Sequence, residues 1–84
     1  MRLKHLIYSE LEQWLFQLGF TALITSGEQK VFRHPRTDTL IVLPKYESQE
    51  PVHPIHLSAV RRILLENGLV SEDIFSNFLE KVPS

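Results

Sequence analysis

Residues 21–43 read TALITSGEQKVFRHPRTDTLIVL, and this stretch decides the fold because it holds three short strand-like segments in succession. Residues 21–25 are branched or apolar and too few for a helix, and residues 29–34 alternate. Residues 39–43 form a nearly continuous apolar run typical of a central or well-covered strand. Turn-forming residues separate the segments. Because such short connections join antiparallel neighbours, the stretch predicts a three-stranded antiparallel meander.

A helix is predicted immediately before this meander. Apolar residues recur there at helical spacing, at Leu11, Trp14, Leu15 and Leu18. Ser9 can cap the helix and Glu12 can complete a capping box, while Gly19 suits the left-handed position that ends a helix. Phe16 falls off the apolar stripe, so we expect its side chain to be exposed or to lie in an interface.

Two further helices are predicted after the meander, beyond a proline-rich loop at 44–54. The first has an apolar stripe and ends at Asn67–Gly68, and the second is capped by Ser71. The order α-β-β-β-α predicts a single α+β domain over residues 1–84, similar in topology to the double-stranded-RNA-binding domain. Its two-layer core covers about residues 9–69, and an additional helix covers about 71–80.

Composition limits the classes of function. The chain has 84 residues, 43% hydrophobic, which is enough for one globular core. It has no cysteine, which excludes disulfides and thiolate metal sites, and we expect no cofactor. The apolar run at the N-terminus is too short for a signal peptide, and no run is long enough to cross a bilayer. We therefore expect a cytoplasmic protein without a membrane partner.

Charge is unevenly distributed around a formal net charge of −1. Four basic residues and one acid lie between positions 30 and 45, whereas four acids and no base lie between 66 and 80. The asymmetry favours two surfaces with different partners, and the alternative is ordinary solvated charge. Six cations could form a track for an RNA backbone, at Lys30, Arg33, Arg36, Lys45, Arg61 and Arg62.

Residues 26–35, SGEQKVFRHP, resemble the signature of the HicA (YcfA-like) family of bacterial toxins. The matching positions are Gly27, Phe32, Arg33, His34 and Pro35. Further similar segments lie at 18–20, 40–44, 60–64 and 67–69, so the resemblance spans about residues 9–69. It implies a fold like the double-stranded-RNA-binding domain, an endoribonuclease (mRNA interferase) activity, RNA as substrate, and a cognate antitoxin as partner.

The chain departs from the family pattern at the residue that matters most for catalysis. Gln29 stands where the family has its catalytic histidine, and Glu28 stands where a serine is usual. Attack by a ribose 2′-hydroxyl needs a group that exchanges protons near neutral pH, which an imidazole does and an amide does not. We therefore expect a HicA-like domain that lacks the usual ribonuclease activity.

Other candidate residues have competing interpretations. His34 is a possible substitute acid/base beside Arg33 and Arg36, or a structural histidine packed at the turn. His53 and His56 are three residues apart, but we expect loop histidines rather than a metal site. The alternative to a toxin-type function is a non-catalytic protein-interaction or RNA-binding module. In the former, the acidic C-terminal helix and surplus apolar surface would bind a protein partner or form a homodimer.

Overall fold

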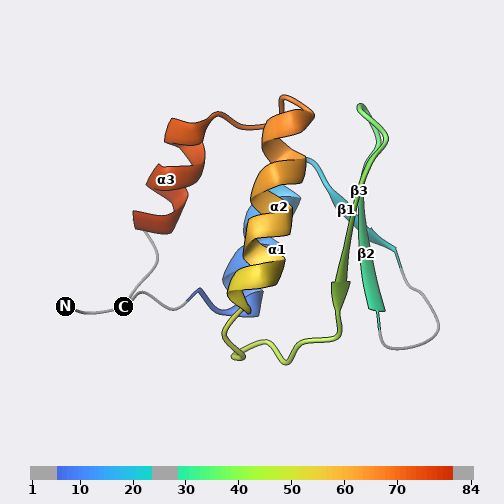
Figure 1. Ribbon diagram of the computed structural model, residues 1–84. Coiled ribbons are helices and arrows are strands. Elements are labelled where there is room, and N and C mark those ends of the chain that lie inside the picture. The colour runs from blue at the N-terminus through green and yellow to red at the C-terminus, as the bar shows by residue number, and fades with distance from the viewer. Residues whose placement is uncertain (1–5, 24–28, 81–84) are drawn as a thin grey trace.

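The protein folds as a small α+β domain, here described from a computed structural model for residues 6–23 and 29–80 (Figure 1). The elements in chain order are α1 (Tyr8–Gln17), β1 (Thr21–Leu23), β2 (Gln29–His34), β3 (Thr39–Pro44), α2 (Pro54–Glu66) and α3 (Glu72–Glu80). The predicted order of elements is therefore confirmed. Residues 24 and 25 of the first predicted strand lie outside the described residues, as do Gly27 and Glu28 of the family motif.

The sheet is the predicted antiparallel meander, with strand order β1-β2-β3. Thr21 pairs with Arg33, and Gln29 pairs with Pro44 at the opposite end. Because side chains alternate along a strand, Phe32 and His34 point to one face, whereas Gln29 and Arg33 point to the other. The hairpin between β2 and β3 closes at Asp38, whose φ of 56° lies in the left-handed region.

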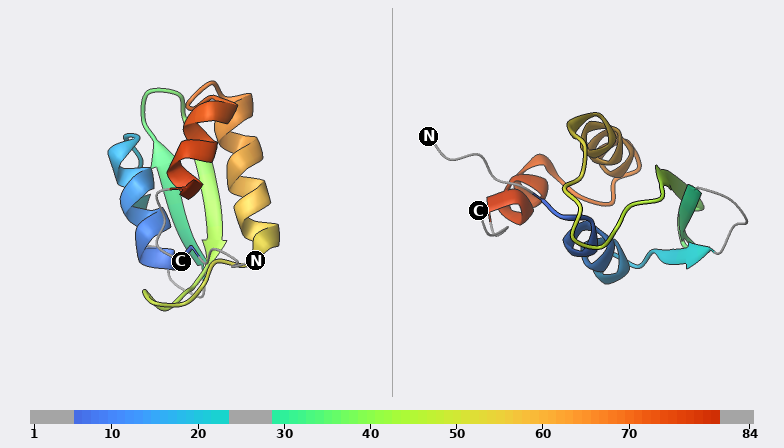
Figure 2. Two further views of the ribbon diagram at one scale, coloured as in Figure 1. Left: turned by 90° about the vertical axis from the view of Figure 1, so that its left-hand side faces the viewer. Right: turned by 90° about the horizontal axis from the view of Figure 1, so that it is seen from below.

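Helices α1 and α2 lie side by side on one face of the sheet, and α3 lies on their far side as a third layer (Figures 1 and 2). The core fills the space between the sheet and these helices; its fully buried large side chains are Phe32, Leu11, Leu15, Ile41, Leu43, Leu64 and Val60. Helix α3 adds the buried Phe75 from the other side. None of the described helices covers the opposite sheet face, which we call the outer face (Figure 2).

The interpretation of residues 39–43 as a central or well-covered strand is wrong. Strand β3 lies at an edge of the sheet and has one open face. Thr39, Ile41 and Leu43 are buried, whereas Leu40 and Val42 are 51% and 50% exposed on the outer face. The apolar side chains of this run therefore alternate between the core and the exposed outer face of the sheet.

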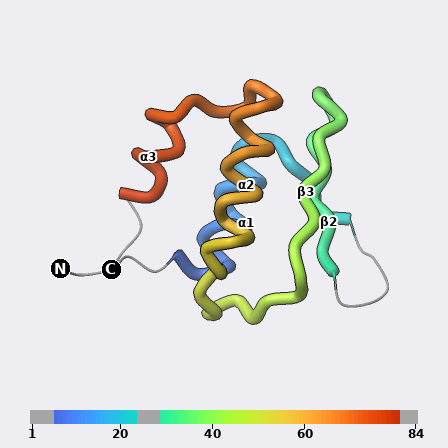
Figure 3. Tube along the Cα trace, in the orientation of Figure 1, coloured from blue at the N-terminus to red at the C-terminus, as the bar shows by residue number. Residues whose placement is uncertain are grey.

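The N-terminus of α1 is also different from the predicted one. The helix begins at Tyr8, and its capping carboxylate is Glu10, which accepts from the Ile7 backbone N–H at 3.2 Å. The loop before α2 supplies the other acceptors, because the Tyr8 N–H donates to the Glu50 carbonyl and the Ser9 N–H to the Ser48 carbonyl. Figure 3 shows this loop passing below the helices. Ser9 is therefore not the cap residue, and Glu12 does not complete a capping box.

The remaining helix ends agree with the sequence. Gly19 and Gly68, which follow α1 and α2, have positive φ values of 106° and 69°. The Ser71 hydroxyl accepts from the Ile74 N–H at the start of α3, so the predicted cap is confirmed. Phe16 is 45% exposed, as expected. In residues 6–23 and 29–80, no helix has the length and apolar character needed to span a bilayer.

Candidate functional site

Gln29 begins β2 on the outer face of the sheet, with an exposed side chain. Its register partner is Pro44, and Lys45 follows that proline, so the amide and this ammonium group belong to the same end of the sheet. An amide can donate and accept hydrogen bonds, and an ammonium can bind a phosphate as a point charge. An amide does not exchange protons as an imidazole does, so Gln29 can help bind an anion but cannot take the acid–base role of a histidine.

His34 lies at the other end of β2 and points into the protein, where it is only 6% exposed. Its Nε2 is 2.9 Å from the Leu18 carbonyl oxygen, which can only accept, so Nε2 carries the proton. Nδ1 then accepts from the Thr37 hydroxyl at 3.3 Å. The ring also meets the Phe20 ring edge-on, with centroids 5.1 Å apart. Both nitrogens are thus engaged within the fold, which favours the structural interpretation of His34 over the catalytic one.

Three of the six candidate RNA-binding cations are held in ion pairs. Arg33 binds Asp38 across the hairpin, with Nη2 at 2.9 Å from the carboxylate. Arg61 of α2 binds Glu72 at the start of α3. Lys30 points to the helix side of the sheet and binds Glu12 of α1. These cations hold elements of the domain together, and an RNA phosphate would have to compete with their partners.

Arg36, Lys45 and Arg62 are the exposed cations of the set with no ion pair among the described residues. Arg36 lies in the β2–β3 hairpin, Lys45 follows the far end of β3, and Arg62 lies on α2. Strand β3 has six residues, so the first two cations are roughly 20 Å apart along it. The six candidate cations therefore do not gather into one patch.

Lys30 also takes part in a cluster on the inner face that sequence reasoning missed. The Tyr8 hydroxyl donates to the Glu12 carboxylate at 3.4 Å, and the Lys30 ammonium lies 5.7 Å from the centroid of the Tyr8 ring. Burial of the Tyr8 side chain, together with the nearby Glu12 carboxylate, raises the pKa of the Tyr8 phenol well above its ordinary value. Tyr8 is thus a neutral hydrogen-bond donor at physiological pH.

Tyr46 links this cluster to His53 and His56. The expectation that both are loop histidines is wrong for His56, which lies in the first turn of α2 and is half-buried. The Tyr46 ring stacks on Tyr8 with centroids 5.4 Å apart, and the Tyr46 oxygen accepts from the His53 backbone N–H at 3.0 Å. The Tyr46 hydroxyl is hydrogen bonded to Nδ1 of His56 at 2.6 Å. His53 itself caps α2 by accepting from the Ile55 N–H. In the part of the chain that the structure describes, no group of three or more potential ligands could hold a metal ion.

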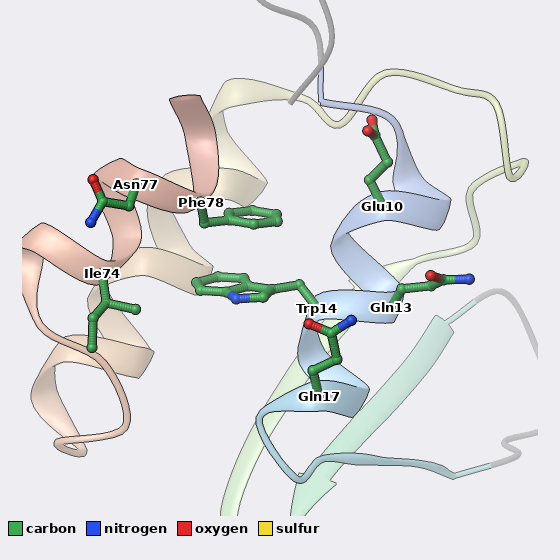
Figure 4. Close-up of a pocket in the computed structure, with 7 residues that line it drawn as sticks. All are labelled: Glu10, Gln13, Trp14, Gln17, Ile74, Asn77 and Phe78. Atoms are coloured by element: carbon green, nitrogen blue, oxygen red, sulfur yellow. The ribbon is translucent and has the colours of Figure 1, made fainter. Parts of the chain in front are cut away.

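A hollow of about 450 Å³ lies between α1 and α3, on the side of α1 away from the sheet (Figure 4). Its apolar part is Ile74 and the Trp14–Phe78 pair, whose rings stack with centroids 3.8 Å apart. Its polar part consists of amides and one carboxylate, from Gln13, Gln17, Asn77 and Glu10. Among the described residues its lining includes no imidazole and no cation, and it lies on the side of α1 away from the sheet that carries Gln29.

The class of protein that these observations define is a small α+β domain with an exposed amide at its candidate site and a buried histidine on the same strand. The chain matches no protein-family model, and no curated protein is significantly similar to it. The resemblance to the HicA family therefore rests on the residues quoted above, and on their order and spacing.

Proposed function

We propose that this chain is a HicA-like, toxin-type domain that binds RNA without cleaving it. The observation that carries the proposal is the position of Gln29, which occupies the exposed end of β2 in place of the family's histidine. The one imidazole of that strand, His34, is buried and hydrogen bonded through both nitrogens. Among the described residues, the site thus has groups that can hold an anion and no group that readily moves a proton.

Three features support RNA as the ligand and a fold like the double-stranded-RNA-binding domain. The elements follow the α-β-β-β-α order of that domain. Lys45 lies next to Pro44, the register partner of Gln29, where a phosphate at the site would meet it. Arg36 and Arg62 are exposed and have no ion-pair partner among the described residues. RNA duplexes are bound mainly through phosphates and 2′-hydroxyls, for which such groups suffice.

The test compares RNA cleavage and RNA binding by the wild-type protein and by Gln29→His. We expect no cleavage by the wild type and a rate increase of about 10² to 10⁴ in the variant. Binding should weaken with salt with a logarithmic slope of about −2 to −3, as expected for three available cations. Lys45→Gln should weaken binding and flatten this slope, whereas Lys30→Gln, a control at a lysine already paired with Glu12, should leave it unchanged.

The opposite results are equally informative. Cleavage by the wild-type protein that survives Gln29→Ala would contradict the loss of activity and return attention to His34. Binding that is absent at low salt, or does not respond to salt, would remove RNA as the ligand. In that case the function of the domain would have to be sought in its binding to other proteins.

The second candidate function is a non-catalytic protein-interaction module on the same fold, of which an antitoxin-like protein would be one partner. It is favoured by the ion pairs that occupy Lys30, Arg33 and Arg61, which reduce the charge available to RNA. A small antitoxin-like reading frame next to the gene would provide the partner to test. Co-purification of the two products, insensitive to ribonuclease, would support this function over RNA binding.

A further inference from the structure

The outer face of the sheet is an apolar surface without a covering element among those described. Its apolar side chains come from all three strands, at Leu23, Val31, Leu40, Val42 and Pro44. Leu23 pairs with Val31, and Val31 pairs with Val42, so these three form one row across the sheet. Leu23, Leu40 and Val42 are 41%, 51% and 50% exposed and account for half of the six exposed large apolar side chains found in the described residues.

The charge on this face is already neutralised within the chain. Arg33 is the one cation that the described strands place on it, and Asp38 binds the guanidinium from the adjoining hairpin, with Nε at 3.0 Å. Gln29 and Thr21 are neutral. A partner that covers this face would need no net charge of its own, because no unpaired charge on the described strands would be buried.

We propose that the outer face is covered by a second copy of this chain, related by a two-fold axis, with the two sheets packed face to face. The proposal does not rest on RNA binding, but Gln29 lies on the same face, so a second copy and RNA at Gln29 would exclude each other. A sheet is the natural cover for a sheet, since two twisted sheets pack about 10 Å apart with interdigitating side chains. A two-fold axis brings the same surface of both copies together in the interface. Here that surface is apolar and carries no net charge, so two copies of it do not repel each other.

The pairing of Arg33 with Asp38 makes a second copy of the chain acceptable as the partner. Two cationic faces would repel each other, but the Arg33–Asp38 pair makes this face neutral. Across a two-fold axis, Asp38 of one copy can approach Arg33 of the other without a like-charge conflict. Glu66, Asp73 and Glu80 lie on α2 and α3, in the layers behind the sheet, so they are not brought together.

The size of the face sets the expected strength of the dimer. The strands are spaced about 4.8 Å apart, and β2 and β3 have six residues but β1 only three, so at about 3.3 Å per residue the footprint is at most roughly 14 by 20 Å. This is smaller than the roughly 800 Å² per partner of a standard stable interface. We therefore expect a reversible dimer whose population rises with protein concentration, not an obligate one.

The absence of cysteine from the chain gives a direct test. Two sheets about 10 Å apart are too distant for a disulfide, which needs Cα atoms within about 7 Å, so a short bis-maleimide reagent is the appropriate probe. Single variants Val31→Cys and Val42→Cys should cross-link to dimers about tenfold faster than Ile55→Cys. Ile55 is a matched control, because it is 70% exposed but lies on α2.

Sedimentation at increasing concentration supplies an independent measurement. We expect the wild type to shift toward the dimer, and Val42→Lys to weaken association by about 30-fold or more, because it buries an unpaired charge. Ile55→Lys should associate like the wild type. Circular dichroism of each variant confirms that the fold is retained, which is expected because both side chains are at least half exposed.

Three results would overturn the proposal. One is a wild-type protein that stays monomeric at every concentration. Another is cross-linking at Val31→Cys and Val42→Cys no faster than at Ile55→Cys. The third is cross-linking that is fast only at Ile74→Cys, which would move the contact to the hollow between α1 and α3. Because Gln29 lies on the covered face, loss of the dimer in Val42→Lys should leave RNA binding no weaker than in the wild type, which separates this interface from the proposed function.

Discussion

Gly19 leaves the space that the His34 ring occupies: a β-carbon at Gly19 would lie 2.9 Å from the His34 Nε2 atom. That nitrogen donates to the carbonyl of Leu18, the residue before this glycine. The end of α1 and the end of β2 are therefore joined by a ring that fits only against a residue without a side chain. Gly19 also has a φ of 106°, which side-chain-bearing residues rarely adopt.

We expect Gly19→Ala to destabilise the protein by about 2 to 4 kcal/mol, because it combines backbone strain with a contact that displaces the imidazole. The matched control is Gly68→Ala, since Gly68 has a φ of 69° but a β-carbon there would meet no atom within 4 Å. The control should lose about 1 kcal/mol, from backbone strain alone. Urea unfolding followed by circular dichroism measures both values, and equal losses would disprove the role of the His34 contact.

His34→Ala should lower the free energy of unfolding by about 2 to 4 kcal/mol, because it leaves a cavity and removes the imidazole hydrogen bonds to the Leu18 carbonyl and the Thr37 hydroxyl. Thermal unfolding and RNA cleavage should be measured on the same preparations. A variant that keeps its stability but loses a cleavage activity present in the wild type would instead make His34 the acid/base.

The sequence correctly predicts those features of the fold that depend on residues close together in the chain. The Ser71 cap, the glycines after α1 and α2, and the hairpin over 35–38 each depend on residues within one turn of the chain. The bounds of β2 also agree with the prediction, because its alternation reports directly which side chains face the core. Sequence alone could not decide between a buried and a catalytic His34, because its acceptor, the Leu18 carbonyl, is 16 residues away.

Features that depend on distant partners could not be predicted. The start of α1 is set by carbonyls of Ser48 and Glu50, in a loop about forty residues further along the chain. The pairing of Arg61 with Glu72 depends on how α3 packs against α2. The apolar run at 39–43 could not reveal an open sheet face, because apolar residues at alternate positions look the same whether a second layer covers them or not.

Phe78→Ala should weaken the attachment of α3 to the rest of the domain. Phe78 stacks on Trp14 with ring planes 5° apart, and Phe75 meets the same indole edge-on. We expect a loss of about 2 to 4 kcal/mol, together with a change in the emission of the one tryptophan of the chain. Ile74→Ala, at a half-exposed position on the same helix, should cost less than about 1 kcal/mol. Equal losses in the two variants would argue against the stack as the main contact.

Tyr8 should make the stability of the protein depend on alkaline pH. Because burial and the Glu12 carboxylate raise the pKa of Tyr8 in the folded state, the unfolded chain loses this proton first, near its ordinary pKa of about 10. The stabilisation by the neutral phenol is thus complete below about pH 10 and is lost by about 1.4 kcal/mol for each further pH unit.

Tyr8→Phe should remove this slope, and Tyr46→Phe, which leaves Tyr8 in place, should retain it. Urea unfolding of the three proteins between about pH 8 and 11.5 measures the slopes. Since deprotonation of lysines is common to all three, a slope that persists in Tyr8→Phe would show that the phenol is not its source.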